Sequence, residues 1–343
     1  MRHVQALLTL LGLLSACAHP SCGPETARGG QSREAREKNR AAPSESAAEE
    51  SLGVAVESKE IQVLGKIKAR RGGVGVRYVA PEATELEAFG SWFRALVSAS
   101  ESNTAPARNA PTGFELDSSD SPLWLAGERA GQRRGAGAFA LRAGTASPWV
   151  IEAPHTFFDV GTLEIAITCF EVLSARALFV NTVRRSNSQD EDLEQEERAD
   201  LARSGEADSD LAHAPQSFFL TAHAVFAQWR PSYSVLQIHG FRDELLPQVS
   251  AVVSAAGTNA SLSAIAEQLQ GLLGRDAVRL YPSEVRKFGG THNVQARLSK
   301  DSGAALVHLE LSRSLRDRLK SDPGFRRTFA LAMKAGMLAE HER

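Results

Sequence analysis

The sequence predicts an α/β domain whose largely parallel sheet is buried between helices. Short apolar segments that suit strands alternate with longer segments of helical apolar spacing over residues 123–343. The strand segments are nearly continuous apolar runs, such as Ala177–Thr182 (ALFVNT), which is typical of strands covered on both faces. That length suits one such domain, and the sequence shows no internal repeat.

Each element of this domain follows from its local pattern. Gly144 suits a tight turn between the first two strands, and Ser261 suits the N-cap of a helix. The predicted strands are Gly137–Arg142, Pro148–Ala153, Ala177–Thr182, Ser234–His239, Ala251–Ala255, Ala277–Tyr281 and Ala304–Ser312. The predicted helices are Thr162–Ser174, Pro215–Gln228, Ser261–Leu273 and Asp322–Leu338.

Residues 60–122 form a separate N-terminal segment before this domain. Val74–Val79 predicts a strand, and Pro81–Ser98 predicts an amphipathic helix with its apolar residues on one face. Residues 99–122 have the composition of a loop, because they contain several turn formers and a single phenylalanine. We therefore expect a strand, a helix and a long connection here.

Residues 1–16 have the pattern of a bacterial lipoprotein signal peptide. Met1–His3 is a short basic start, and the apolar run Val4–Leu14 is too short for an ordinary transmembrane helix. The small residues before Cys17 resemble a lipobox, which makes Cys17 the expected lipidation site; an ordinary secretory signal with a chance cysteine is the alternative. Ala18 in place of an aspartate favours an outer-membrane lipoprotein of the cell envelope.

Two further segments are low in apolar residues. Residues 17–59 are rich in Ala, Ser, Glu, Arg and Gly, and this composition predicts a disordered tether. The acidic stretch 189–210 predicts a solvated loop rather than a calcium or basic-partner site, because dense like charges repel and no ligand spacing is present. The formal net charge is −2, so we expect no nucleic-acid partner, and membrane contact only through the lipid anchor.

Two histidines and two carboxylates follow the ends of predicted strands. His155 and Asp159 come directly after Pro148–Ala153, His239 ends its strand, and Glu310 lies late in the last strand. In open α/β sheets, ligands bind beyond the carboxyl ends of the strands. A hydrolytic zinc site uses three protein ligands, an open position and a free carboxylate as general base. These residue types therefore predict such a site.

Each of these residues also has a structural interpretation. His155 could cap backbone groups, and Asp159 could be an acid favoured by the dipole of the helix that follows it. Glu310 is the most informative, because its neighbours ALVHLELS form a buried run. An ionised carboxylate is costly there unless a metal, an arginine or a proton offsets its charge.

Other polar residues near the predicted strand ends have two interpretations. Arg185 could hold a substrate carboxylate or pair with the acidic loop. Asn293, beside His292 in GGTHNV, could bind substrate or only make the turn. His213 and His223 flank an apolar helix, which favours core or surface positions over metal ligation.

The residues at the predicted site resemble those of a known family. APHTFFDVGTLEIA (153–166) resembles the His-Gly-Gly-x-Ile-Glu-x-Gly-Thr segment of the poly-γ-glutamate hydrolases. LQIHGF (236–241) and ALVHLELSRSLRD (305–317) look like that family's second histidine and its Gln-Leu-Glu-Leu-Ser-x-x-x-Arg strand. More distantly, the chain is similar to N-formylglutamate amidohydrolases. The likeness covers roughly residues 148–320 in three patches, with GGTHNV as a weaker fourth.

The resemblance implies a zinc-carboxypeptidase-like fold, which is a three-layer α/β/α arrangement with a mainly parallel mixed sheet. It also implies zinc as cofactor, with His155, Asp159 and His239 as ligands and Glu310 as general base. Asp159 replaces the family's glutamate and falls one residue closer to the histidine, and Thr-Phe-Phe replaces its glycines.

These expectations combine into a lipid-anchored, zinc-dependent amidohydrolase or peptidase of the cell envelope. Its substrates would be peptide or γ-glutamyl amides, and Arg185, Asn293, Arg313 and Arg316 are the candidates for binding them. The alternative is a non-catalytic metal- or ligand-binding envelope lipoprotein on the same fold. The presence of Glu310 favours the enzyme, because a binding protein has no need of a general base.

Overall fold

A computed structural model describes residues 62–70, 78–120, 122–183, 210–256 and 261–338. The expected signal peptide, lipidation site and tether lie outside these residues, as do Arg185 and all but the last residue of the acidic loop. The described residues belong to one compact unit, residues 45–343. None of the helices in this part of the chain combines the length and the apolar character needed to cross a membrane.

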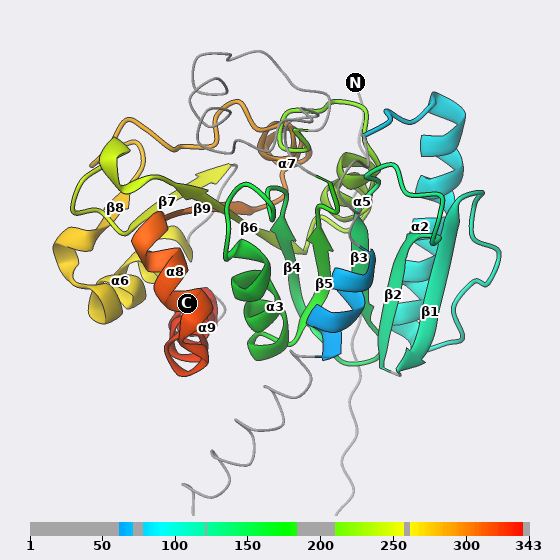
Figure 1. The fold of residues 1–343 in the computed structure, drawn as a ribbon, viewed down its shortest axis with the longest axis horizontal. Coiled ribbons are helices and arrows are strands. Elements are labelled where there is room, and N and C mark those ends of the chain that lie inside the picture. The colour runs from blue at the N-terminus through cyan, green and yellow to red at the C-terminus, as the bar shows by residue number, and fades with distance from the viewer. Residues whose placement is uncertain (1–61, 71–77, 121, 184–209, 257–260, 339–343) are drawn as a thin grey trace, which may run out of the picture. The chain divides into compact units, whose positions relative to one another are not determined.

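Nine strands among the described residues form one mixed sheet in the order β1-β2-β3-β5-β4-β6-β9-β7-β8 (Figure 1). The strands β5, β4, β6 and β9 at its centre are parallel. β1, β2, β3 and β5 pair antiparallel in that order, as do β7 and β9, whereas β8 is parallel to β7. The strands are Phe114–Asp120 (β1), Leu123–Glu128 (β2), Ala138–Arg142 (β3), Ser147–Ala153 (β4), Ala175–Val180 (β5), Ser234–Phe241 (β6), Ala251–Ala256 (β7), Val278–Leu280 (β8) and Leu306–Ser312 (β9).

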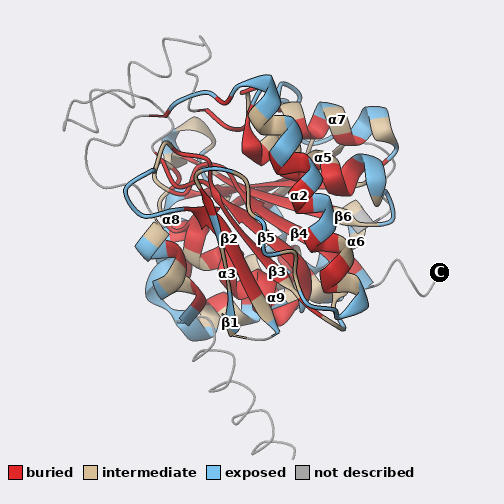
Figure 2. Ribbon diagram, turned by 90° about the vertical axis from the view of Figure 1, so that its right-hand side faces the viewer, coloured by how far each residue is buried: buried red, intermediate tan, exposed pale blue. Residues whose placement is uncertain are grey.

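Helices cover both faces of the sheet, so that the buried strands lie between two helical layers (Figure 2). One layer holds α3, α6, α8, α9 and the helical residues 62–70, and the other holds α2, α5 and α7. The helices are Ala83–Ser102 (α2), Thr162–Val172 (α3), Phe218–Trp229 (α5), Ser261–Leu273 (α6), Val294–Ser302 (α7), Arg313–Ser321 (α8) and Pro323–Leu338 (α9). The α/β class predicted from the sequence, with parallel strands at the centre of a mixed sheet, is confirmed.

The two-residue period of the strands divides the core into two clusters. On β4, Trp149 and Ile151 pack in the cluster under α3 and α9, whereas Val150 packs in the cluster under α2 and α5. Successive side chains of a strand point to opposite faces, so an unbroken apolar run supplies both cores at once. This explains why the central strands are apolar at nearly every position.

The segment before residue 123 shares its core with the domain that follows. Phe89 and Phe93 of α2 stack on one another, and both contact Phe139 of β3. β1 extends the same sheet by pairing with β2. The boundary expected at residues 122 and 123 therefore does not separate two cores.

Several elements differ from those predicted. β1 lies inside the predicted loop 99–122, and the helical residues 62–70, β2, α7 and α8 were not predicted. Of the predicted strand Val74–Val79, only Tyr78 and Val79 are described, and they have no regular secondary structure.

The strand order places the candidate residues at one edge of the sheet. β5 follows β4 in the chain and lies on one side of it, whereas β6 lies on the other side. Such a change of direction leaves a crevice at the carboxyl ends of the adjacent strands. The carboxyl ends of β4, β6 and β9 meet beside this crevice, because the three strands are parallel.

Candidate metal centre

His155 and Asp159 come from the turn between β4 and α3. The backbone amides of Phe158 and Asp159 both donate to the carbonyl oxygen of His155, at 3.0 and 2.7 Å, so the chain turns tightly between the two residues. Gly161 follows in the left-handed region, at φ 98°, which favours glycine. The turn places His155 Nδ1 3.5 Å from Asp159 Oδ2.

His239 and Glu310 reach the same place from β6 and β9. They are register partners in the parallel pair, so their side chains project from the same face of the sheet. The backbone amide of Gly240 donates to Asp159 Oδ2 at 3.0 Å and ties the end of β6 to the turn after β4. Three separate segments therefore hold these four side chains together.

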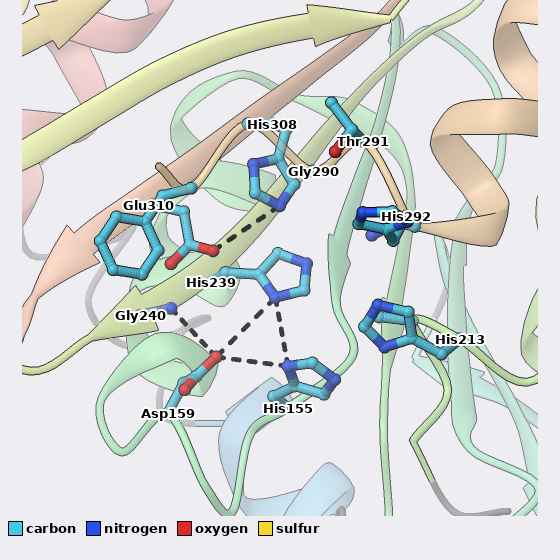
Figure 3. A pocket seen from close by; sticks show the side chains of 14 residues that line it. His155, Asp159, His213, His239, Gly240, Gly290, Thr291, His292, His308 and Glu310 are labelled. Atoms are coloured by element: carbon cyan, nitrogen blue, oxygen red, sulfur yellow. Dashed lines mark hydrogen bonds and ion pairs between the residues drawn. The ribbon is translucent and has the colours of Figure 1, made fainter. Parts of the chain in front are cut away.

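Three ligand atoms from these residues point toward one another (Figure 3). His155 Nδ1 lies 3.2 Å from His239 Nδ1, and Asp159 Oδ2 lies 3.5 and 3.8 Å from these two nitrogens. All three residues are buried, with 3–5% of their surface exposed. The cluster could hold a metal ion, because histidine nitrogen and carboxylate oxygen are ligand atoms that zinc takes.

The hydrogen bonds on the far side of each imidazole fix which nitrogen carries the proton. His155 Nε2 lies 2.8 Å from Asp210 Oδ1, and a carboxylate can only accept, so Nε2 is the donor. His239 Nε2 lies 2.8 Å from Gln237 Oε1, an amide oxygen whose orientation is set because Gln237 Nε2 donates to Glu152 Oε2 at 2.8 Å. When both imidazoles are neutral, both Nδ1 atoms therefore present lone pairs to the centre of the cluster.

This arrangement fits a bound cation. With both imidazoles neutral, two nitrogen lone pairs and a carboxylate oxygen face one another within 3.8 Å, and they repel unless a proton or a metal ion lies between them. Zinc bonds to nitrogen and oxygen at about 2.0–2.1 Å, so a tetrahedral ion separates its ligand atoms by about 3.3 Å. The observed separations bracket that value. Ligating histidines also commonly donate their other N–H to a carboxylate or carbonyl group, as both do here.

Glu310 and His308 lie beyond His239, as seen in Figure 3. His308 Nε2 is 3.8 Å from Glu310 Oε1, and the His308 ring packs against the His239 ring with centroids 4.6 Å apart. Burial, which penalises the charged imidazolium, lowers the pKa of His308 from its ordinary value of 6.5 to about 4. His308 is therefore neutral at neutral pH and adds no positive charge to the site.

The candidate centre opens into a cavity of about 240 Å³. His155, Asp159, His239 and Glu310 line it together with the loop Phe288–Asn293. A Cβ atom on Gly290 would lie 2.8 Å from the His308 ring, so glycine lets this loop approach the site closely. The candidate ligands are thus buried but remain reachable from the cavity.

Two adjoining cavities extend the cleft on either side. One, of about 250 Å³, shares Asp159 and Glu310 with the central cavity and is lined by Phe158, Phe241 and four arginine or leucine side chains. The other, of about 380 Å³, shares the loop glycines and His308 with it. The central cavity is therefore continuous with two others through shared lining residues.

Two of the predicted substrate contacts have structural partners instead. Arg316 is buried, and its guanidinium donates to the carbonyl oxygens of Leu311, Val160 and Phe241 at 3.2, 2.6 and 3.3 Å. It braces the segments that carry the candidate ligands. Asn293 is also buried, and its Oδ1 accepts from two backbone amides as the N-cap of α7. Both residues also line cavities at the centre, Asn293 the central one and Arg316 the one of about 250 Å³.

The other predicted substrate contacts have different positions. Arg313 is half exposed beside the cavity of about 250 Å³, where its Nε donates to Asp317 at 3.0–3.1 Å. Arg242 lines the same cavity and was not predicted. Arg185 lies outside the described residues, so its predicted role stays a prediction.

Asp210 and His213 lie at the centre, although the sequence did not predict a role for either residue there. Asp210 ends the predicted solvated acidic loop, but it is buried and accepts from His155 Nε2. His213 lines the central cavity, with Nδ1 3.0 Å from Asp210 Oδ2. No local signal separates Asp210 from the acids before it, because its partner lies 55 residues away in the sequence.

No protein family model and no curated protein sequence matches the chain. Solved structures match it at low identity. A bacteriophage poly-gamma-glutamate hydrolase is 16% identical over 60% of this chain and 90% of its own, with a TM-score of 0.38. The CwlD amidase from Clostridioides difficile, solved with the GerS lipoprotein, is 10% identical over 57% and 98%, with a TM-score of 0.32. The N-acetylmuramoyl-L-alanine amidase AmiC2 of Nostoc punctiforme is 8% identical over 58% and 100%, with a TM-score of 0.30. Likeness at this level carries no activity over to this chain.

Proposed function

We propose that the protein is a zinc-dependent hydrolase of amide bonds, with zinc held by His155, Asp159 and His239. The observation that carries the proposal is the pair of Nδ1 atoms 3.2 Å apart beside Asp159 Oδ2, since in the neutral imidazoles the hydrogen bond on each Nε2 leaves Nδ1 as a lone pair. Three protein ligands that face a cavity leave a position open, which is the arrangement of catalytic rather than structural zinc sites.

Glu310 is the proposed general base. When bound, zinc supplies a Lewis acid that polarises a carbonyl oxygen and makes water a better nucleophile at neutral pH. Glu310 lines the same cavity and is not part of the ligand triad, so its carboxylate can accept a proton from the attacking water. The new C–O bond replaces the C–N bond of the amide, and Glu310 returns the proton to the leaving nitrogen.

The proposed substrates are peptides or γ-glutamyl amides. The cleft continues on both sides of the centre, and Arg242 and Arg313 line one side of it. A guanidinium group binds carboxylates through two parallel hydrogen bonds, which suits a substrate with a free carboxylate near the cleaved bond.

Metal analysis of the purified protein tests the proposal first. We expect about one zinc per chain, and we expect His155→Ala or His239→Ala to remove it, because each deletes one of three ligands. His292→Ala is the matched control, since His292 lines the cavity but is not among the possible metal ligands of the described residues. Full zinc content in both ligand variants would show that the metal is bound elsewhere.

Turnover separates the enzyme from a metal-binding protein. The zinc-loaded protein is assayed on a panel of γ-glutamyl and cell-wall peptides, with release of new amine groups as the measurement. Bound zinc without hydrolysis of any substrate would favour the non-catalytic envelope lipoprotein.

The proposed location is the cell envelope, through a lipid on Cys17. The support is the lipobox-like sequence alone, since these residues lie outside those described. We expect Cys17→Ser to release the protein from membranes and to remove the lipid mass. Membrane fractionation and mass spectrometry measure this, and a variant that stays with the membrane would contradict the proposed anchor.

A further inference from the structure

A row of buried polar side chains crosses the sheet beneath the candidate metal centre. Glu152 of β4 is the register partner of Gln237 of β6, and Gln237 is the register partner of His308 of β9. Glu152 and Gln237 are both 0% exposed. Buried polar groups are costly unless they are hydrogen-bonded, so the partners of these two side chains define what they do.

Gln237 joins three parts of the molecule through its amide. Its Nε2 donates to Glu152 Oε2 at 2.8 Å, and its Oε1 accepts from His239 Nε2 at 2.8 Å. The same Oε1 accepts from Nδ2 of Asn293, whose own orientation is set because its Oδ1 caps α7. Glu152 and Asn293 therefore both require the amide of Gln237 to point its oxygen toward His239.

The opposite orientation of this amide would be incompatible with the ligand set. A flipped Gln237 would turn its oxygen toward the Glu152 carboxylate and its NH₂ group toward Asn293 and His239. His239 Nε2 would then have to accept, and the imidazole proton would move to Nδ1, which faces the other two ligand atoms. An N–H at that position cannot bind a metal ion.

Glu152 is itself anchored from the helical layer. Its Oε1 lies 2.8 Å from His223 Nδ1 of α5, and His223 Nε2 lies 3.0 Å from Ser299 Oγ of α7. A continuous series of hydrogen bonds thus runs from α7 through His223, Glu152 and Gln237 to His239. All of its members are buried, so water cannot replace a missing partner.

We infer that Glu152 and Gln237 are positioning residues, which fix the tautomer and the direction of His239 and thereby strengthen metal binding. This inference rests on the proposed zinc site. The two ligand imidazoles are then linked to a carboxylate in different ways. His155 donates directly to Asp210, whereas His239 donates to the amide of Gln237, which in turn donates to Glu152. Asn293 donates to the same Oε1 from the loop that lines the cavity, so it helps to position His239.

Zinc affinity of the full chain, measured by competition with a chelator, tests the inference. We expect Gln237→Met to weaken zinc binding about 10–100-fold, which is the usual effect of losing a partner of a ligating histidine. Glu152→Gln keeps an acceptor for Gln237 but no longer forces its direction, so we expect about a tenfold loss. Asn293→Ser keeps a cap for α7 and removes the Nδ2 donor, and we expect a loss of several-fold.

Glu128→Gln is the matched control. Glu128 is also a buried carboxylate, but it accepts from the backbone amides of Arg134, Gly135 and Ala136 at 2.9–3.0 Å and lines none of the three cavities. We expect this variant to lose stability and to keep the zinc affinity of the wild type. The absorption bands of the cobalt-substituted protein provide a second readout, because they report the direction of the ligands and not the stability of the fold.

The outcomes separate the inference from the proposed function. If the wild type binds no zinc, the proposed function fails and the inference fails with it. If the wild type binds zinc and the folded Gln237, Glu152 and Asn293 variants bind it equally well with unchanged cobalt spectra, only the inference is overturned. Should Gln237→Met not fold, the milder Asn293→Ser decides. An equal loss of affinity in Glu128→Gln would also overturn it, since the effect would then be one of general stability.

Discussion

The two faces of the central strands differ in composition. One face is apolar along its whole length, whereas the other becomes polar toward the carboxyl ends of the strands. On the face under α3, α6 and α9, the side chains of β4, β6 and β9 are apolar to the ends of the strands; these are Trp149, Ile151, Ala153, Leu236, Ile238, Val307, Leu309 and Leu311. On the face under α2, α5 and α7, each strand begins apolar and then turns polar; the polar residues are Glu152, Gln237, His239, His308 and Glu310.

This difference shows how one set of strands provides both stability and a site. Because side chains alternate between faces, each strand can fill an apolar core on one side and present ligands on the other. The polar face is stable only because its groups bond to one another, which explains the chain of contacts from Ser299 to His239. Substitutions on the two faces should therefore differ in kind.

The largest effect is expected at Glu310, on the polar face. Glu310→Gln is nearly isosteric and leaves the three proposed ligands intact, so zinc content and melting temperature should change little. Hydrolysis should fall about 10²–10⁴-fold, because the amide cannot accept the proton of the attacking water. Turnover, zinc content and melting temperature are measured together on wild type and variant. Unchanged turnover in a folded, zinc-loaded variant would exclude Glu310 as the base.

The next effect is expected at Ile238, which lies between Gln237 and His239 but points to the apolar face. Ile238→Ala should lower the free energy of unfolding by about 2–5 kcal/mol, because the side chain is 0% exposed and its removal leaves a cavity. Zinc stoichiometry should stay at that of the wild type. Urea denaturation measures the free energy of unfolding, and metal analysis measures the zinc stoichiometry. Ile238→Val is the control with a smaller deletion, and it should lower the free energy of unfolding by about 0.5–1.5 kcal/mol. Loss of zinc in a folded variant would show that the faces are not independent.

The sequence predicts most of this arrangement, and the exceptions have physical reasons. The central strands and the longer helices have strong apolar periodicity, so their type was predicted correctly. β1 (FELDSSD) is mostly polar and pairs with one neighbour at the edge of the sheet, which leaves almost no apolar pattern. α7 and α8 are nine residues each and mostly polar, so they lack the long apolar face of a predictable helix.

The candidate site divides in the same way. His155, Asp159, His239 and Glu310 follow strand ends, and parallel strands bring such ends together, so their meeting could be predicted. The partners behind them could not be predicted in the same way. Asp210 approaches from a distant loop, and nothing local marks it. Gln237 and His308 do leave one signal. Each lies two residues before His239 or Glu310 on the same strand, so its side chain points to the same face of the sheet.

A third effect, on stability against pH, is expected at His308. Its native pKa of about 4 lies below the ordinary value of 6.5, so between these values the unfolded chain binds more protons than the folded one. The contribution of His308 to the free energy of unfolding is therefore fully present above pH 6.5, where the side chain is neutral in both states. It is lost as the pH falls toward 4. A difference of this size corresponds to about 3 kcal/mol.

His308→Gln removes this titration and keeps a hydrogen-bonding side chain. In the metal-free protein, we expect the wild type to lose up to about 3 kcal/mol more than the variant when the pH falls from 7 to 4. Denaturation midpoints at several pH values measure it, and the comparison with the variant removes the contribution of other groups. Parallel pH curves for the two proteins would show that His308 is not held neutral by burial.

The smallest effect is expected at Ser254, where the polar row reaches β7. Ser254 is the register partner of His308 and is fully buried, but its Oγ lies 3.4 Å from both His308 Nδ1 and the His308 carbonyl oxygen. Hydrogen bonds this long are weak, so Ser254→Ala should change the free energy of unfolding by less than about 1 kcal/mol and leave zinc affinity unchanged. Ser299→Ala is the matched substitution at the other end, where the 3.0 Å contact to His223 is of ordinary length. It should cost about 1–3 kcal/mol, because it leaves a buried imidazole nitrogen without a partner. Urea denaturation of both variants measures the difference. An equal or larger loss at Ser254 would show that the polar face extends across β7, and that the proposed metal centre depends on a wider part of the sheet than the three strands β4, β6 and β9.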